Sequence, residues 1–400
     1  MKLSVLQLCN KPPLPSTDGG CIAMHRVTSG LLKAGASVKL LTIETHKHPL
    51  KRKELPADYV AATEIESAFV DTRINLVDAF SALITDDSYN VSRFFTPDFD
   101  RLLIKTLKKR KFDIIHLESL FMTPYIKTIR KYSKGKIVLR SHNLEHMIWQ
   151  QLASGTKNFP KKTYLKILSR QLKKYETSVL NSVDGIAAIT REDVKKYLSF
   201  KCTIPLVSIP FGIDIDNYPV VTPKSQFEFF HLGAMDWEPN VEGIRWLLDK
   251  VWPQVISRQP DAKLRLAGRN MPDWLLNGKF PGVKIQGEID NAIGFMKNKS
   301  VMVVPLLTAG GIRVKILEAM ALGKCVISTG IGANGISYSN GENIVIADTA
   351  AEFVKEMVTI LKNPDTSREI GKQARQLAEN MYDNKLLTRD LINFYYSLIH

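Results

Sequence analysis

The sequence predicts an α/β fold made of two Rossmann-like, doubly wound domains that face each other across a cleft. Short apolar runs of strand length alternate with helical patterns along almost the whole chain of 400 residues. The runs are apolar at nearly every position, which is typical of parallel strands buried on both faces. They form two consecutive series, separated by a polar stretch at residues 215–225. This pattern indicates two parallel sheets, each covered by helices.

The elements follow from the same pattern. Strands of the first series are expected at residues 2–8, 37–43, 114–117, 137–140, 185–189 and 207–210. Strands of the second series are expected at residues 227–232, 263–267, 283–286, 301–305, 325–328 and 344–347. The helices between them include residues 20–33, 161–181, 240–258 and 314–322, and an amphipathic helix is expected at 385–399.

These elements divide the chain into an N-terminal domain at residues 1–217 and a C-terminal domain at residues 218–383. The final helix, within residues 384–400, is expected to pack back across the domains. Residues 44–100 are acidic and poorly periodic, so a loop-rich insertion is expected there. Because doubly wound domains bind ligands at the carboxyl ends of their strands, the functional site is expected in the cleft.

The net charge is concentrated in one quarter of the chain. The whole sequence holds 55 Lys and Arg against 40 Asp and Glu, and residues 101–200 hold 22 and 7 of these. A local basic surface favours an anionic partner, such as an anionic membrane surface. A nucleic-acid partner is not expected, because base stacking needs interleaved aromatic residues. The basic segments at residues 105–111 and 161–174 have mainly aliphatic spacing instead.

Composition also excludes several classes of protein. Hydrophobic residues make up 44% and charged residues 24% of the chain, which is ordinary for a globular protein and excludes disorder. The first ten residues fit a buried strand better than a signal peptide, and no segment reaches the ~18 apolar residues of a membrane span. The four cysteines form no Cys-x-x-Cys pair, which argues against a disulfide framework or a zinc site. A cytoplasmic, thiol-reduced protein is expected, peripheral on the inner face of the cytoplasmic membrane.

Two loops after N-terminal strands carry candidate functional residues. Gly19 and Gly20 follow the first strand and a Pro-rich loop, and they open a helix. Glycines allow the backbone to approach a ligand closely, and free N–H groups at a helix N-terminus favour anions. His142, Asn143 and Glu145 follow an apolar strand, where a polar cluster indicates a site and His142 is suited to act on a hydroxyl or bind an oxygen. The alternatives are a tight turn for the glycines and a satisfied loop histidine.

The strongest candidate segment lies in the C-terminal domain at residues 308–320. Gly310 and Gly311 turn the chain after an apolar strand, and a helix is expected to begin near Ile312. Arg313 and Lys315 fall in its first turn, where cations oppose the helix dipole, so a bound anion such as a diphosphate explains them better than helix stability.

The helix of this segment also carries a carboxylate among apolar residues. Glu318 lies between Leu317 and Ala319, and a carboxylate in so apolar a helix needs a partner. A pair of sugar hydroxyls would serve, and an internal salt bridge from Arg313 is the alternative.

Three weaker segments complete the set. Residues 233–240, which include Asp236, link the first strand of the second domain to its first helix, and Asn240 is a plausible helix cap. Residues 328–335 form a second Gly-rich strand end, with turn and function equally favoured. Asp214 and Asp216 resemble a metal-binding Asp-x-Asp pair, but they lie in the expected linker and indicate turn chemistry.

Together these segments resemble the family 4 (group 1) glycosyltransferases of the GT-B fold, and the resemblance covers essentially the whole chain. Its most specific part is the run Gly-Ile-Arg-Val-Lys-Ile-Leu-Glu-Ala-Met-Ala at residues 311–321. The Gly-x-Met-Asp-aromatic-x-Pro-Asn loop at 233–240 indicates one subgroup of the family. The remaining motifs are the Pro-rich loop with Gly19 and Gly20, His142-Asn143-x-Glu145, and the segment at 209–214.

The resemblance implies a retaining transferase that moves a sugar from a nucleotide-diphospho-sugar to a hydroxyl. Glu318 matches the second glutamate of the family's Glu-x7-Glu motif, which holds the nucleotide ribose. The first glutamate, which contacts the donor sugar, would fall at Gly310 and is absent. The Arg and Lys that usually follow the first strand of the second domain are also missing, and Asp236 lies in that region. Arg313 and Lys315 are expected to supply the charge for the diphosphate instead.

The expected site therefore has three parts. The catalytic residues are His142, placed by the resemblance near the anomeric centre, with Arg313 and Lys315. Asn143 and Glu145 are candidates for the acceptor side. The donor-binding residues are Gly19, Gly20, Asp236, Gly310, Gly311, Ile312 and Glu318.

The expected activity is metal-independent sugar transfer of the hexosyltransferase type, without a cofactor. The acceptor would be a glycan or a lipid-linked molecule, in cell-surface polysaccharide biosynthesis. Two alternatives remain open at this point: a nucleotide-sugar epimerase on the same fold, and a nucleotide-sugar-binding protein without turnover. The basic region at residues 101–200 would face an anionic membrane surface, where lipid-linked acceptors reside.

Overall fold

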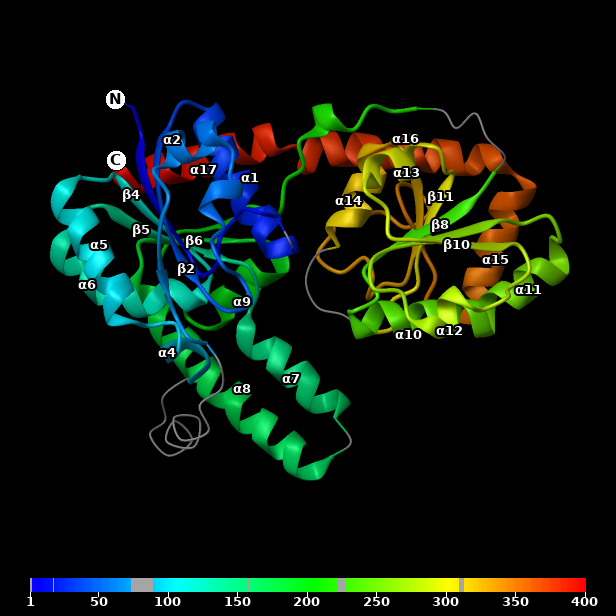
Figure 1. The fold of residues 1–400 in the computed structure, drawn as a ribbon, viewed down its shortest axis with the longest axis horizontal. Coiled ribbons are helices and arrows are strands. Elements are labelled where there is room, and N and C mark those ends of the chain that lie inside the picture. Colours follow the sequence, from blue (N-terminus) through cyan, green and yellow to red (C-terminus); the bar gives the residue numbers. More distant parts are fainter. Residues whose placement is uncertain (1, 17, 73–88, 157, 222–226, 309–312) are drawn as a thin grey trace. The chain divides into compact units, whose positions relative to one another are not determined.

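Two parallel β-sheets, each with its own helices, make up the chain (Figure 1). The computed structural model describes residues 2–16, 18–72, 89–156, 158–221, 227–308 and 313–400. Unit 1 combines Met1–Gly212 with Leu387–His400, and unit 2 is Ile213–Leu386. The domain limits expected from the sequence, at residues 217 and 384, lie close to these bounds. They stay predictions. Two Rossmann-like α/β units confirm the predicted fold class.

The sheet of unit 1 has the strand order β3-β2-β1-β4-β5-β6-β7, with every neighbouring pair parallel. All strands expected from the first apolar series are confirmed. The bounds are β1 Ser4–Cys9, β2 Ser37–Glu44, β3 Glu66–Phe69, β4 Ile114–Glu118, β5 Lys136–Ser141, β6 Gly185–Ala188 and β7 Leu206–Ser208.

The prediction of a loop-rich insertion at residues 44–100 is wrong for the described part of that segment. It contains the 3₁₀ turn η1 (Arg52–Glu54), α2 (Ala57–Thr63), the edge strand β3 and α4 (Tyr89–Ser92). The strand β3 pairs only with β2, so it is half-buried and its residues lack the apolar run that marks the inner strands. The edge strands β7 and β10 were predicted because they keep apolar residues, whereas β3 has too few of them to be recognised.

Helices cover both faces of this sheet. Leu6 and Leu8 point into a core completed by α5 and α6, whereas Val5 points into the opposite core, completed by α1 and α17. The side chains alternate in this way because successive residues of a strand face opposite sides. The bounds are α1 Gly19–Lys33, α5 Pro97–Lys109, η2 Leu120–Tyr125, α6 Ile126–Tyr132, α7 Glu145–Gly155, α8 Phe159–Val179, η3 Leu180–Ser182, α9 Arg191–Ser199 and α17 Asn384–Ile399. The last helix thus packs on the sheet of the N-terminal unit (Figure 1).

The sheet of unit 2 is also parallel and has the order β10-β9-β8-β11-β12-β13. Its strands match the second apolar series. They are β8 Phe229–Leu232, β9 Leu264–Ala267, β10 Val283–Gly287, β11 Val301–Val304, β12 Cys325–Ser328 and β13 Val345–Ile346. Phe229, Leu264, Val301 and Ile327 join the helices in one apolar core.

The helix expected at residues 240–258 is divided by one π-helical turn. It consists of α10 (Glu238–Trp246), the π turn η5 (Leu247–Val251) and α11 (Trp252–Arg258). Pro253 lies in the first turn of α11 and has no N–H to donate to the preceding turn, which explains the change in hydrogen bonding. The remaining elements are η4 Ile215–Asn217, α12 Asp273–Leu276, α13 Ala292–Lys297, α14 Val314–Ala321, α15 Ala350–Lys362 and α16 Pro364–Met381.

The helix α14, at Val314–Ala321, agrees with the helix expected at residues 314–322, and its C-terminal end carries a local signal. The helix begins just after Arg313 and ends before Gly323, whose φ of 69° is left-handed and suits glycine. Lys324 then donates its backbone N–H to the carbonyl of Ala319 and closes the turn.

Among the helices of the described ranges, none is both long enough and apolar enough to cross a bilayer.

Candidate functional site

The polar residues of unit 1 gather at the carboxyl ends of three neighbouring strands. Cys9 at the end of β1 lies opposite Glu118 at the end of β4, and Glu118 lies opposite Arg140 near the end of β5. His142 follows β5 directly. Because the strands are parallel, these ends meet at one edge of the sheet, as expected for the ligand-binding edge of such a fold.

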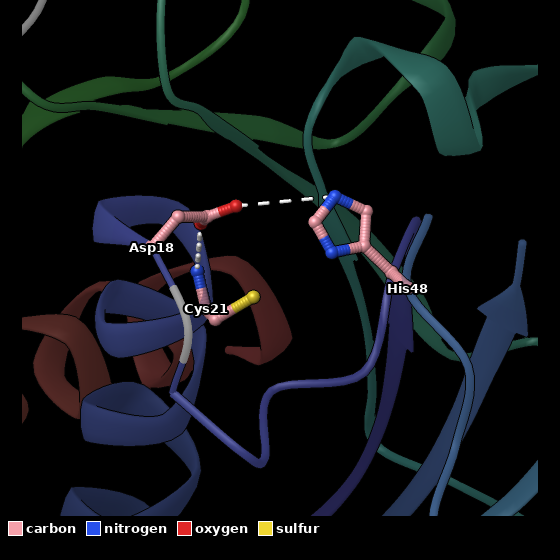
Figure 2. Close-up of side chains that lie close together, drawn as sticks. All are labelled: Asp18, Cys21 and His48. Atoms are coloured by element: carbon pink, nitrogen blue, oxygen red, sulfur yellow. Dashed lines mark hydrogen bonds and ion pairs between the residues drawn. The ribbon is translucent and has the colours of Figure 1, made fainter. Parts of the chain in front are cut away.

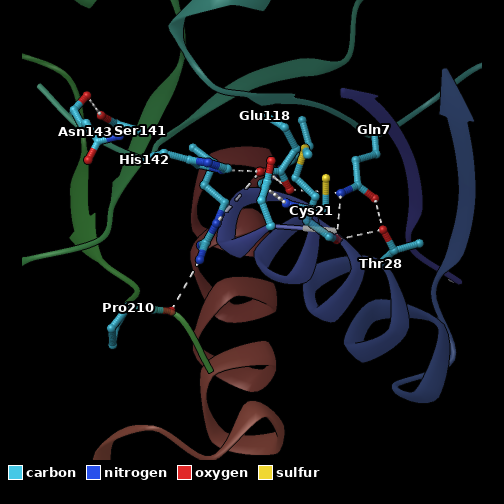
Figure 3. A network of polar contacts seen from close by, with 12 residues as sticks. Gln7, Cys21, Thr28, Glu118, Ser141, His142, Asn143 and Pro210 are labelled. Carbon is cyan, nitrogen blue, oxygen red and sulfur yellow. Dashed lines mark hydrogen bonds and ion pairs between the residues drawn. The ribbon is translucent and has the colours of Figure 1, made fainter. Parts of the chain in front are cut away.

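A fully buried carboxylate, that of Glu118, is the centre of this group (Figure 3). Its Oε1 accepts hydrogen bonds from Gln7 Nε2 at 2.9 Å and His116 Nε2 at 3.0 Å, and its Oε2 accepts one from His142 Nε2 at 2.7 Å. The Nε of Arg140 lies 3.9 Å from Oε2. Burial alone would raise the pKa of Glu118, but the charges and hydrogen bonds of His116 and His142 outweigh it and hold that pKa well below its usual range.

The contact with Glu118 determines how His142 can act. An ionised carboxylate only accepts hydrogen bonds, so Nε2 of His142 carries the proton. In the neutral ring Nδ1 is then an acceptor, available to a ligand hydroxyl. The side chain is 12% exposed, and its ring packs edge-on against Phe211 with centroids 5.6 Å apart. His142 is therefore held in one orientation at the mouth of a buried network.

The network extends to the C-terminal helix. Tyr395 on α17 lies with its hydroxyl oxygen 2.5 Å from Nδ1 of His116. Burial, and then the charge of Glu118, raise the pKa of Tyr395 well above its usual value, so the phenol keeps its proton and shares a hydrogen bond with Nδ1 of His116. Sequence reasoning missed Glu118, His116 and Tyr395. The alternation of polar residues in the strand at 114–118 was the only local signal for the first two.

Asn143 and Glu145 lie at the start of α7, beside α8. Glu145 is buried, and burial together with the nearby carboxylate of Glu176 raises its pKa to about 7, against a hydrogen bond from Asn143. Glu176 itself bonds Nδ1 of His146 at 2.6 Å and accepts from the backbone N–H of Glu145 at 3.3 Å. These contacts tie Glu145 to the junction of α7 and α8, and its acceptor-side role stays a prediction.

The Gly19-Gly20 turn opens α1 as expected, with Asp18 as its N-cap. The Oδ1 of Asp18 accepts from the backbone N–H of Cys21 at 2.9 Å. Both oxygens of Asp18 also accept from Lys11 Nζ, at 2.8 and 2.6 Å. Burial would raise the pKa of Asp18, but Lys11 and Cys21 lower it to about 2. A Cβ on Gly20 would come within 3.1 Å of Lys11 Nζ, whereas one on Gly19 would meet open space. The sequence analysis missed Lys11, a cation at this turn.

Asp18, Cys21 and His48 form a group whose ligand atoms all lie within 4.8 Å of one another (Figure 2). The charge of Asp18 is already neutralised by Lys11, and burial and the charge of Lys11 lower the pKa of His48. A second cation would have to displace or face that ammonium, so the group does not fit a metal ion well.

In unit 2, Glu318 on α14 is buried, and both of its carboxylate oxygens contact side chains of the described residues. Its Oε1 accepts from the hydroxyl of Tyr218 at 2.9 Å, and its Oε2 pairs with Lys315 Nζ at 2.7 Å. The expectation that this carboxylate needs a partner is confirmed. The salt bridge observed within the helix comes from Lys315, which lies one helical turn before Glu318 at i−3.

Arg313 lies just before α14 and stacks its guanidinium on the ring of Trp237, with the Cζ atom 4.7 Å from the ring centroid. Burial lowers the pKa of Arg313 to about 10. Asp236, next to Trp237, accepts a hydrogen bond from Asn270 Nδ2 at 3.1 Å. The loops after β8 and β11 thus bring Asp236, Trp237 and Arg313 to the carboxyl edge of the second sheet. Sequence reasoning missed a role for Trp237, whose ring orients the guanidinium of Arg313.

Several predictions concern the loops around this edge. Gly310, Gly311 and Ile312 lie outside the described residues. The expectation that Asn240 caps a helix is wrong: α10 begins at Glu238, and Asn240 Nδ2 donates to the carbonyl of Ala234 instead. Asp216 lies in the turn η4 and pairs with Lys385 at 2.6 Å, and turn chemistry for Asp214 and Asp216 stays a prediction. Gly330 N–H donates to Asp348 at 2.8 Å, as in a structural turn.

Comparisons with known proteins agree with this architecture. A family model described as "Glycosyltransferase Family 4" matches residues 22–217, and one described as "Glycosyl transferases group 1" matches residues 226–363. An uncharacterized 44.6 kDa protein in the cps region of Klebsiella pneumoniae is 26% identical over 69% of this chain and 72% of its own length. Phosphatidyl-myo-inositol mannosyltransferase of Mycolicibacterium smegmatis is 23% identical over 75% of each chain.

Solved structures share the fold over the whole chain. Sucrose-phosphate synthase from Thermosynechococcus elongatus superposes with a TM-score of 0.70 at 17% identity, covering 99% of both chains. The Anabaena protein HepE in complex with UDP superposes with a TM-score of 0.68 at 13% identity, covering 99% of this chain and 100% of the other. At these identities the similarity shows a common fold.

Proposed function

We propose that this chain, a glycosyltransferase of the GT-B fold, transfers a sugar with retention of anomeric configuration from a nucleotide-diphospho-sugar to a hydroxyl group. The acceptor is a glycan or a lipid-linked molecule. The observation that carries the proposal is the carboxylate of Glu318, buried and paired with Lys315 on the helix α14, which begins directly after Arg313. The relative from the cps region supports a role in cell-surface polysaccharide biosynthesis.

The donor side follows from the contacts of unit 2. The ribose of the donor has two neighbouring hydroxyls, which a carboxylate binds with both oxygens. Binding of that ribose to Glu318 releases Lys315 from Oε2, and the ammonium then reaches the diphosphate. Arg313, already fixed on Trp237, adds a second positive charge. Both cations stabilise the negative charge that gathers on the leaving nucleoside diphosphate.

Unit 1 contributes the opposite charge. As the bond to the leaving group breaks, positive charge develops at the anomeric carbon. His142 presents Nδ1 as an acceptor to the sugar hydroxyls, and Glu118 behind it supplies a fixed negative charge in a buried setting. Low local polarity strengthens that interaction. Gly19, Gly20 and Lys11 add backbone N–H groups and a cation at the start of α1.

The test is turnover by the full chain with a panel of UDP-glucose, UDP-galactose and GDP-mannose. We expect release of nucleoside diphosphate that depends on an added hydroxyl acceptor, and a product with the donor's anomeric configuration by NMR. Activity is expected to persist in EDTA, since Arg313 and Lys315 supply the positive charge that a metal would otherwise supply. Isomerised nucleotide-sugar without an acceptor product would indicate the epimerase alternative and contradict the proposal.

The basic region of unit 1 supports docking on an anionic membrane. The helices α7 and α8 lie side by side as a hairpin (Figure 1). Near the tip, Phe159 is 77% exposed and Leu152 is 52% exposed. The exposed basic residues of α8 are Lys161, Lys166, Arg170, Lys173 and Lys174. Apolar residues flanked by cations match a surface that enters the headgroup region of a bilayer.

Changing Lys161, Lys166 and Arg170 to Gln is expected to weaken binding to phosphatidylglycerol vesicles about a hundredfold, since each basic residue contributes about 1 kcal/mol. Co-sedimentation at low and high salt measures the effect. Substitution of Lys250, Lys355 and Lys362 in unit 2 by Gln removes the same charge and serves as the control. Equal loss in both triple variants would show a net-charge effect and would refute docking through α8.

A further inference from the structure

A cavity of unit 2 lies at the edge of its sheet that the transfer reaction does not use. It encloses about 430 Å³. Its lining includes Phe227, which precedes β8, Ser300, which precedes β11, and Lys324, which precedes β12. Because these strands are parallel, the cavity is at their amino ends, opposite the loops that hold Asp236 and Arg313. A cavity of this volume fits a small organic ligand.

The walls of the cavity are strongly basic. Lys324, Arg368, Lys372 and Arg375 line it, and its lining, which is made of described residues, includes neither Asp nor Glu. Pro364 and Ser367 place the first turn of α16 at the same wall. The N-cap of that helix, Asn363, makes no side-chain cap hydrogen bond, so the first N–H groups of the helix can donate to an anion. Asp365 in the first turn is itself paired with Arg368.

Lys324 is the least expected of these cations, because it is only 3% exposed. Its Nζ donates to the carbonyl of Lys297 at 2.8 Å and, more weakly, to that of Val221 at 3.4 Å. No carboxylate pairs with it within the described ranges. Burial, and then the charge of Lys299, lower the pKa of Lys324 to about 8. An ammonium group has three donors and is costly to bury without an opposite charge, so Lys324 is suited to receive an anion.

The other cations differ in how far they are already neutralised. Arg375 pairs with Glu379 at 2.5 Å and also bonds the carbonyl of Tyr218, which fixes it as part of the wall. Arg368 pairs with Asp365 at the surface. For Lys372, no ion pair is found among the residues the structure describes. Lys324 and Lys372 therefore carry the charge that remains for a ligand.

We propose that this cavity is a second ligand site, which binds a phosphate-bearing molecule. Its phosphate lies between Lys324, Lys372 and the first turn of α16, and its less polar part lies against Val220 and Phe227. Two features agree on this chemistry: a cluster of cations that includes the buried ammonium of Lys324, and a helix terminus without a side-chain cap. The phosphate group belongs either to a soluble molecule or to a lipid headgroup, and the site does not depend on the transfer reaction.

The test uses the full chain with both Lys324→Met and Lys372→Ala. Inorganic pyrophosphate is the soluble probe, and phosphatidylcholine vesicles with or without phosphatidic acid are the lipid probe. Calorimetry measures affinity, and hydrogen exchange of residues 364–376, compared with residues 313–321, locates binding. We expect a loss of affinity of about tenfold or more, since two charge-assisted contacts are removed. A double Ala variant of Lys250 and Lys355, both exposed in unit 2, is the control.

The outcomes separate the sources of phosphate. Slower exchange at residues 364–376 with pyrophosphate, lost in the double variant but kept in the control, supports a soluble ligand. The same pattern with phosphatidic acid vesicles alone supports a lipid headgroup. If neither probe slows exchange there, or if the double variant responds like the wild type, the proposal is overturned. Arg368→Ala with Lys372→Ala, which changes only exposed side chains, replaces the first variant if Lys324→Met does not fold.

Discussion

Glu318→Ala is expected to lower kcat/KM for sugar transfer by roughly 10²- to 10⁴-fold while the chain stays folded. The carboxylate is proposed to make two hydrogen bonds to the donor ribose, and hydrogen bonds to charged groups contribute about 1.5–3 kcal/mol each. The variant also removes the carboxylate that positions Lys315, so its ammonium is no longer held where it can move to the diphosphate. Calorimetry with UDP or GDP should show the loss in binding, and steady-state assays the loss in turnover.

The cost to stability should be small by comparison. Lys315 is 42% exposed and water can solvate it once Glu318 is gone, while Tyr218 loses one acceptor, so we expect about 1–2 kcal/mol of destabilisation. Glu369→Gln on the exposed face of α16 is the matched control, with unchanged nucleotide affinity. Turnover of Glu318→Ala close to that of the wild type, in a folded sample, would rule out Glu318 as the ribose ligand.

Glu118→Gln is expected to impair both the activity and the stability of the chain. The carboxylate is fully buried and accepts from three side chains, and the amide puts a donor where only acceptors fit. Breaking a buried ionic network costs about 3–5 kcal/mol of the free energy of unfolding. The orientation of His142 and the negative charge behind it are lost together, for which we expect a fall in kcat of about 10²- to 10³-fold.

The stability difference should depend on pH in a defined direction. Since the pKa of Glu118 in the folded chain lies well below its ordinary value of 4.5, ionised Glu118 stabilises the fold fully above that value. The contribution is lost as pH falls from 4.5 toward the lowered pKa. Urea unfolding of wild type and Glu118→Gln should therefore differ at neutral pH and converge in acid. Glu192→Gln on the exposed surface of α9 is the control, and a pH-independent difference would contradict the assignment of a buried anion.

The sequence predicted the strands best where both faces of a strand are buried. In those segments nearly every residue is apolar, and the flanking helices show a period of 3.6 residues. The edge strand β3 and the π turn η5 were missed, because partial burial and a single proline leave weak local signals. Asn240 shows the same limit, since its role as a loop tie to Ala234 depends on a contact outside its own helix.

The sequence by itself determined the α/β class, the two series of parallel strands, the strand end that carries His142 and the helix that carries Glu318. Those features follow from residue type and spacing along a short segment. Only the tertiary structure decided the partners of these residues. Tyr395 reaches His116 across 279 positions of sequence, and Tyr218 reaches Glu318 across 100. The physical reason is that a buried charge is stabilised by the donors that the folded sheet brings within hydrogen-bonding distance. The local pattern of apolar and polar residues does not identify those donors.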